Sequence, residues 1–86
     1  DFSGEINVLS YNSANNMFRP SQDGYLLVQT WSSNSTINLW IDVSRLMIPI
    51  RTSAITSYVL YVRKGIPFWI DGSGNDRSAY FHPVSS

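Results

Sequence analysis

Residues 57–71, SYVLYVRKGIPFWID, contain the strongest β-strand signal in the chain, and the fold is organised around them. From Tyr58 onward, β-branched and aromatic side chains alternate with period two, which is the pattern of a half-buried strand. Gly65 supplies the backbone freedom that a tight corner needs, and Pro67 suits the start or edge of the next strand. The stretch therefore predicts strand, tight corner, strand, and we expect a β-hairpin here.

Two segments before this stretch have equally clear strand patterns. Residues 24–31 (GYLLVQTW) place apolar side chains on both faces, which predicts a central strand covered on both sides. Residues 36–43 (TINLWIDV) alternate most cleanly, with Ile37 and Leu39 on one side and Trp40 on the other. Both segments are therefore predicted to be β-strands.

Shorter segments complete the expected strands. Pro49 cannot donate a ladder hydrogen bond, so its segment is predicted to be an edge strand or a corner. Residues 19–24 (RPSQDG) are typical of a turn, in which Pro20 presets φ and Gly24 can take a positive φ. The sequence therefore predicts an all-β fold, a small antiparallel β-sandwich or jelly-roll-like domain of six to eight short strands. The additional strands are expected at residues 5–10, 44–50 and 78–82.

The composition fits one small domain over residues 1–86, with residues 1–4 as a lead-in from an upstream segment. A chain of this size buries only about 60% of its unfolded surface. Without cysteine it has neither a disulfide nor a thiolate zinc site to supplement its core. Self-association is the remaining common supplement, and three Trp, five Tyr and four Phe residues suit it.

Charge and motif content exclude several function classes. Six acidic and six basic residues are scattered singly, so neither a nucleic-acid-binding stripe nor a polybasic membrane patch is expected. His82 is the only histidine, and no serine lies in a nucleophile-elbow pattern. We therefore predict no catalytic residues, no cofactor and no enzyme activity. The apolar runs are too short for a transmembrane helix, so no membrane insertion is expected.

Two polar segments are the candidate binding loops. The loop after the 57–71 stretch (DGSGNDR) offers oxygen ligands that calcium prefers, but it lacks EF-hand spacing. Ordinary turn chemistry explains the same residues, so we predict no metal and leave a calcium ion as an alternative. The connection after the first strand is rich in Asn and Ser. The predicted binding residues are Asp71, Ser73, Asn75, Asp76 and Arg77 in the first loop and Tyr11, Asn12 and Asn15 in the second.

Two tryptophans lie out of phase with the apolar side chains around them. Trp40 shares its face with Asn38 and Asp42, and Trp69 neighbours Asp71. A large aromatic side chain beside polar groups can stack on a sugar or anchor a partner. The simpler alternative is that another sheet or another subunit covers the strand faces that carry these tryptophans. We predict that Trp40 and Trp69 lie at a subunit interface.

Three motifs occur in order over about residues 19–84. Residues 19–28 (RPSQDGYLLV) are similar to an aromatic/Pro-Ser-x-Asp-Gly-Tyr strand, and residues 61–65 (YVRKG) to a valine-x-lysine-glycine corner. Residues 79–84 (AYFHPV) are similar to a terminal aromatic-x-Pro strand. In this order the motifs resemble those of small C-terminal β-sandwich modules, the knobs or heads of bacteriophage tail-fibre, spike and tail-needle proteins. The chain departs from them at Ile66-Pro67, where an acidic residue often follows the glycine, and in the apolar residues 46–50.

This resemblance implies a homotrimeric, non-catalytic module in the virion tail, extracellular after release. Such a module binds a host-cell surface receptor, either a polysaccharide or an outer-membrane protein. The receptor contacts differ among these modules, so the resemblance assigns no binding residue. Two alternatives stay open: a structural trimerisation or capping domain of the virion, and a monomeric carbohydrate-binding module.

Overall fold

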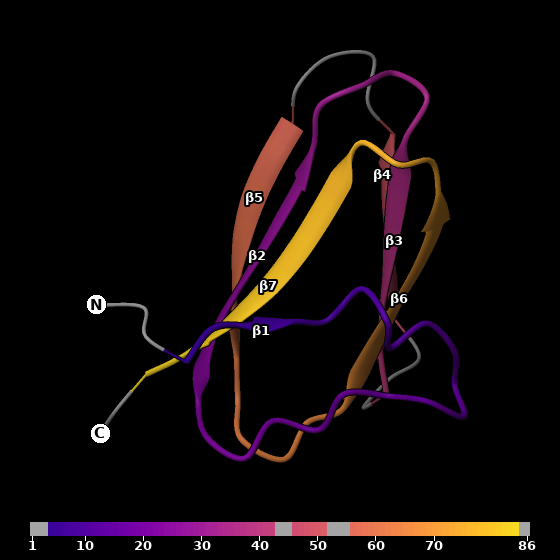
Figure 1. The fold of residues 1–86 in the computed structure, drawn as a ribbon. Helices are drawn as coiled ribbons and strands as arrows, with labels where there is room; N and C mark the ends of the chain where they lie inside the picture. Colours follow the sequence, from indigo (N-terminus) through magenta and orange to yellow (C-terminus); the bar gives the residue numbers. More distant parts are fainter. Residues whose placement is uncertain (1–3, 43–45, 52–55, 85–86) are drawn as a thin grey trace.

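The computed structural model describes residues 4–42, 46–51 and 56–84, which form two antiparallel β-sheets packed face to face (Figure 1). One sheet has the strand order β1-β7-β2-β5, and the other has the order β4-β3-β6. The predicted all-β sandwich is therefore confirmed. Among the described residues there is no helix long and apolar enough to cross a membrane. The strands are β1 (Ile6–Asn7), β2 (Gly24–Thr30), β3 (Thr36–Ile41), β4 (Leu46–Arg51), β5 (Thr56–Val62), β6 (Phe68–Ser73) and β7 (Arg77–Pro83).

Most predicted strands occur close to their expected positions. The segment around Pro49 is an edge strand, β4, paired only with β3 among the described strands. The first predicted strand shortens to the two residues of β1, and the last extends to Pro83. Residues 1–3 of the predicted lead-in and residues 43–45 lie outside the described residues.

The 57–71 stretch turns between the two sheets instead of forming a hairpin. Its first strand, β5, pairs with β2, and its second, β6, pairs with β3. The corner itself is confirmed, because Gly65 has a φ of 82° and donates its N–H to the Pro20 carbonyl oxygen at 2.9 Å. The hairpin prediction is wrong because the two strands face each other across the core, and side-by-side pairing would prevent that packing.

The core lies between the sheets and consists of the side chains that the alternation places in phase. Leu26 and Ile37 are fully buried, and Val28 and Leu39 are 1% exposed. Removing this apolar area from water is the main force that holds the two sheets together. The buried cluster is Val8, Phe18, Leu26, Val28, Ile37, Leu39, Phe68, Ile70, Ala79 and Phe81.

The connection between β1 and β2 is irregular, but one aromatic residue anchors it in the core. The Phe18 ring lies 5.2 Å from the Tyr11 ring, 5.4 Å from Phe68 and 5.3 Å from Phe81, measured between centroids. Phe18 also exchanges two backbone hydrogen bonds with Phe68, at 2.8 and 3.0 Å. The connection is thus packed along β6 and joins both sheets.

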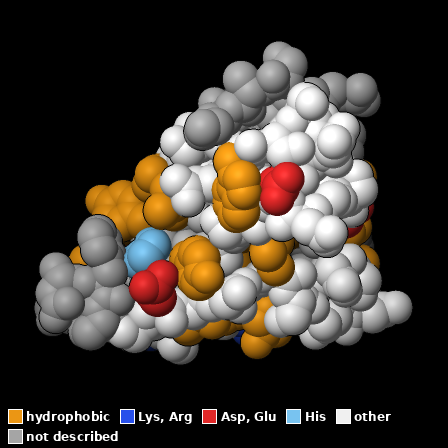
Figure 2. Space-filling view, turned by 45° about the horizontal axis from the view of Figure 1, so that its top comes forward, with side chains coloured by type: hydrophobic (Ala, Val, Ile, Leu, Met, Phe, Trp, Pro, Cys, Tyr) orange, Lys and Arg blue, Asp and Glu red, His pale blue; other side chains and the backbone are white. Residues whose placement is uncertain are grey.

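Strand β2 is central, as predicted, but the described residues cover only its inner face. It lies between β7 and β5, and its burial alternates from residue to residue. Tyr25 on the outer face is 42% exposed and makes an edge contact with Tyr61, with ring centroids 5.3 Å apart. Figure 2 shows orange hydrophobic side chains flanking the pale-blue histidine at the surface. The prediction that both faces of β2 are covered is therefore wrong for the single chain, because each sheet of a two-layer sandwich has one face that is not packed against the other sheet.

The three motifs of the phage resemblance meet at one end of the four-stranded sheet. The Asp23 carboxylate accepts the Lys64 N–H at 2.7 Å, and the Asp23 carbonyl accepts the Val84 N–H at 2.9 Å. The hydrogen bond from the Lys64 N–H, followed by the one from the Tyr61 hydroxyl, lowers the pKa of Asp23. Residues of the three motifs are therefore neighbours in the structure.

Candidate functional site

Three cross-strand pairs lie on the outer face of the three-stranded sheet. Strands β3 and β6 run antiparallel, and their register joins an aromatic pair, an amide–carboxylate pair and a hydroxyl pair. Cross-strand pairs of this kind are the contacts that stabilise a sheet face. We call them the outer ladder: Trp40–Trp69, Asn38–Asp71 and Thr36–Ser73.

The two tryptophans of the outer ladder stack on each other. Their rings are nearly parallel, with an interplanar angle of 5° and centroids 5.1 Å apart. Because aromatic planes in contact lie about 3.5–4.0 Å apart, the rings are displaced sideways by about 3–4 Å. Offset stacking is the favoured arrangement, and it leaves part of each indole face uncovered by the other. Both side chains are half-buried within one chain, and the predicted subunit interface at Trp40 and Trp69 stays a prediction.

The carboxylate of Asp71 links the first two pairs of the ladder. Its Oδ1 accepts a hydrogen bond from Asn38 Nδ2 at 2.9 Å, and its Oδ2 accepts one from Trp40 Nε1 at 3.2 Å. A carboxylate oxygen has a second lone pair, so each can accept a further donor. Asp71 is therefore a positioned acceptor beside two indole rings.

The third pair requires a close approach of the two strands. The hydroxyl oxygens of Thr36 and Ser73 lie 3.3 Å apart, and the Ser73 N–H donates to Thr36 Oγ1 at 3.2 Å. Between the second and third pairs, Gly72 has a φ of 143°, and a Cβ there would collide with the Thr36 carbonyl oxygen. A glycine at this position lets β6 approach β3.

One predicted binding segment runs beside the outer ladder. The Ile70 N–H donates to the Tyr11 carbonyl oxygen at 2.9 Å, which holds the connection against the free edge of β6. Asn12 and Asn15 are exposed in this connection, so they stay candidate contacts. The Tyr11 ring packs on Phe18 at the border of the core and is partly buried, and its predicted binding role stays a prediction.

The predicted 71–77 loop is shorter than expected, because its first three residues extend β6. Asp71 and Ser73 are ladder residues rather than loop residues. Asn75 and Asp76 lie in the turn that follows, and Arg77 begins β7. The five predicted binding residues therefore divide among the face of β6, the turn that follows it and the first residue of β7.

That turn is tied to the connection between β2 and β3. The Asp76 N–H donates to Ser35 Oγ at 2.9 Å, and the Asp76 carbonyl accepts the Trp31 N–H at 3.0 Å. Arg77 Nε donates to the Gly74 carbonyl oxygen at 3.1 Å. In the described part of the chain, no cluster of three or more acidic or histidine side chains is arranged to hold a metal ion.

Sequence reasoning left two ladder residues unassigned. Thr36 and Asn38 share their strand face with Trp40, because each lies two positions from the next. The sequence shows that these residues share one face of β3, but it does not show which residues of β6 lie opposite them.

Comparisons with protein-family models, with curated proteins and with solved structures find no match to this chain. The outer ladder and the three motifs therefore carry the functional proposal.

Proposed function

We propose that this chain is a non-catalytic module that binds a polysaccharide on the host-cell surface, at the tip of a bacteriophage tail fibre or spike. The observation that carries the proposal is the outer ladder. It places two parallel indole rings directly beside a carboxylate and an amide on an open sheet face.

This combination matches the chemistry of a sugar ring. A pyranose has one face of C–H groups, which packs on an aromatic ring, and a rim of hydroxyl groups, which donate and accept hydrogen bonds. Trp40 and Trp69 supply the aromatic surface, a role that replaces the subunit interface predicted for them from the sequence. Asp71 supplies acceptors that the ladder already holds in place. Pre-positioned groups lose little conformational entropy when they bind.

The charge of the ladder favours a neutral ligand. Asp71 is its one ionisable side chain, and a carboxylate repels phosphate, sulfate and uronic acid groups. The same repulsion disfavours single-stranded nucleic acid, which needs a basic groove beside its stacking residues. We therefore assign the site to a neutral sugar segment of the polysaccharide.

The setting on a fibre follows from the resemblance of the three motifs. Fibres present several copies of their tip, so a weak single site is sufficient for tight attachment through avidity. A module of this kind needs no catalytic residue, and it acts from the virion outside the cell.

The experiment is a binding screen against an array of purified bacterial surface polysaccharides. We expect wild-type protein to bind at least one neutral polysaccharide and Trp69→Ala to lose at least about tenfold in affinity, because truncated aromatic anchors dominate such contacts. Trp31→Ala is the matched control, since Trp31 is 48% exposed and lies outside the ladder. Asp71→Asn tests the acceptor without a change in size.

Equal polysaccharide affinity of wild-type protein and Trp69→Ala would show that the outer ladder is not the binding site. Binding to host cells without binding to any polysaccharide on the array would instead favour an outer-membrane protein as the receptor. If deletion of the module spared adsorption but impaired fibre assembly, the chain would be a structural domain of the virion.

A further inference from the structure

In the described part of the chain, three of the four sheet edges are protected against pairing with another strand. β1 is only two residues long, and β4 contains Pro49, which has no N–H to donate. The edge of β6 is covered by the connection between β1 and β2, which is hydrogen-bonded to it through the backbone of Phe18 and Tyr11. Short strands, edge prolines and covering segments are the usual means by which proteins prevent edge-to-edge association.

Among the described residues, the fourth edge, β5, has none of these features. Its sequence, TSYVLYV, has seven residues without a charge, a proline or a glycine, and it is rich in β-branched and aromatic side chains. The first charged residues, Arg63 and Lys64, come after its end. Within the described part of the chain, β5 pairs with β2 only. A long, uncharged edge strand is a ready template for another strand.

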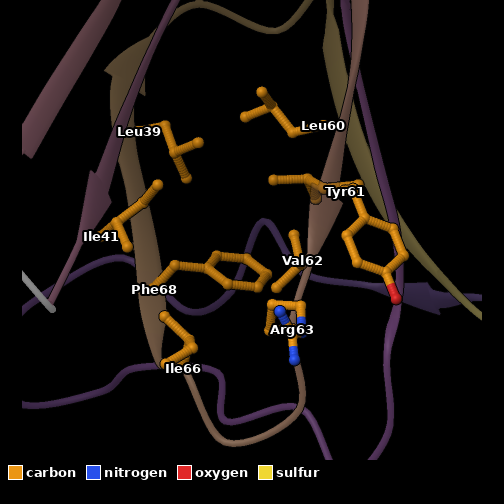
Figure 3. Close-up of a pocket in the computed structure, with 9 residues that line it drawn as sticks. Leu39, Ile41, Leu60, Tyr61, Val62, Arg63, Ile66 and Phe68 are labelled. Carbon is orange, nitrogen blue, oxygen red and sulfur yellow. The ribbon is translucent and has the colours of Figure 1, made fainter.

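The core is also incomplete along this edge. Leu60 and Val62 of β5 point toward Ile41 and Phe68 of the other sheet (Figure 3). They line an apolar hollow of about 150 Å³, and Ile41, Leu60 and Val62 are only partly buried. A strand added beside β5 would cover this side of the hollow and bury these side chains further.

We infer that β5 pairs antiparallel with β5 of a second copy of this chain, about a two-fold axis at Val59. In this register Val59 lies opposite its own copy, Ser57 opposite Tyr61, and Tyr58 opposite Leu60. Outer side chains meet outer ones and inner side chains meet inner ones, so both faces of the sheet continue across the axis. Because β5 carries no charged side chain, pairing with its own copy brings no like charges together. A charged strand of another protein would find no side chain of opposite charge on β5.

The two-fold axis is perpendicular to the joined sheet, since the pairing keeps the outer face on the same side in both copies. The two three-stranded sheets then lie side by side, and both outer ladders face the same direction. If the ladder binds a polysaccharide as proposed, the pair presents two sites to one surface and gains affinity through avidity. The self-association does not depend on the proposed function, and it replaces the trimer that the resemblance implies with a two-fold pair.

The test is the molar mass in solution, measured by light scattering after size exclusion from micromolar to millimolar protein. We expect twice 9.7 kDa for the wild-type chain. Val59→Lys places two like charges across the axis and should raise the dissociation constant at least about tenfold. Val84→Lys is the matched control, because Val59 and Val84 are both exposed, at 57% and 40%, but Val84 lies outside β5.

A wild-type mass of 9.7 kDa over the whole concentration range would overturn the inference. A mass of three times 9.7 kDa would agree with the trimer that the resemblance implies, and it would also overturn two-fold pairing. Amide hydrogen exchange of residues 57–62 keeps the inference testable if Val59→Lys does not fold. Exchange must slow as the wild-type concentration rises, and exchange independent of concentration contradicts the pairing. If wild-type protein has a mass of twice 9.7 kDa but binds no polysaccharide, only the proposed function is refuted.

Discussion

Truncation of Phe18 to alanine should remove a large part of the stability of the domain. A buried phenylalanine takes about 150–200 Å² out of water, of which alanine retains a part, so about 100–150 Å² of burial is lost. At about 25 cal/mol per Å² this is about 3 kcal/mol. The cavity between Tyr11, Phe68 and Phe81 adds to the loss, which gives about 4 kcal/mol and lies within the range for such core substitutions.

This loss is severe for a chain of 86 residues, whose total stability is expected at about 4–13 kcal/mol. The assay is urea unfolding followed by circular dichroism, together with a thermal melt in which Tm should fall by about 15–30 °C. Phe18→Leu keeps most of the apolar volume and should cost about 1–2 kcal/mol. Trp31→Ala removes a larger ring from a site that is 48% exposed and should cost less than about 1 kcal/mol.

The reasoning would be refuted if Phe18→Ala lost no more stability than Trp31→Ala. Such a result would mean that the connection between β1 and β2 does not contribute to the core. The position of Asn12 and Asn15 beside the outer ladder would then also lose its support.

The remaining predictions concern a glycine and a carboxylate. Gly72→Ala should lower the free energy of unfolding, measured with urea, by about 3 kcal/mol or more. A Cβ there would collide with the Thr36 carbonyl oxygen, and alanine rarely adopts the φ of this position. Gly65→Ala meets nothing within 4 Å and should cost only about 1–2 kcal/mol of backbone strain, so equal losses would contradict the close approach of the strands. The lowered pKa of Asp23 contributes stability that is fully present above the ordinary value of 3.8 and is lost as the pH falls through the folded-state value. In thermal melts at a series of acidic pH values, Tm should therefore fall less steeply with decreasing pH for Asp23→Ala than for the wild type, because the variant lacks the carboxylate that accepts the Lys64 N–H. Parallel plots of Tm against pH for the two proteins would refute this role of Asp23.

Several features of the fold could be read from the sequence because they depend on neighbouring residues only. Period-two alternation put Ile37 and Leu39 on one face of their strand, which is buried in the structure, and it put Trp40 and Trp69 on the opposite face of their strands. It did not distinguish the buried face of β2 from the exposed one, because both faces carry apolar side chains. The corner at Gly65 followed from its backbone freedom, which the φ of 82° confirms. The edge position of β4 followed from the missing N–H of Pro49.

Gly24 shows where local reasoning was insufficient. The turn pattern suggested a positive φ, but Gly24 is not among the glycines with that conformation. A Cβ at Gly24 would instead lie 2.5 Å from both the His82 carbonyl oxygen and the Phe81 ring. The glycine is needed for space between β2 and β7, and a sequence does not show which strand lies beside it.

The sequence by itself thus determined the strands, the phase of each strand and the presence of a corner. Only the tertiary structure decided that β5 and β6 belong to different sheets, that Trp40 lies opposite Trp69, and that Asp71 joins the pair. The physical reason is the range of the interactions. Alternation follows from backbone geometry within a few residues, whereas strand partners are selected by the burial of both apolar faces in one core. That selection depends on the whole chain at once, and it placed the candidate site on the outer face of the three-stranded sheet.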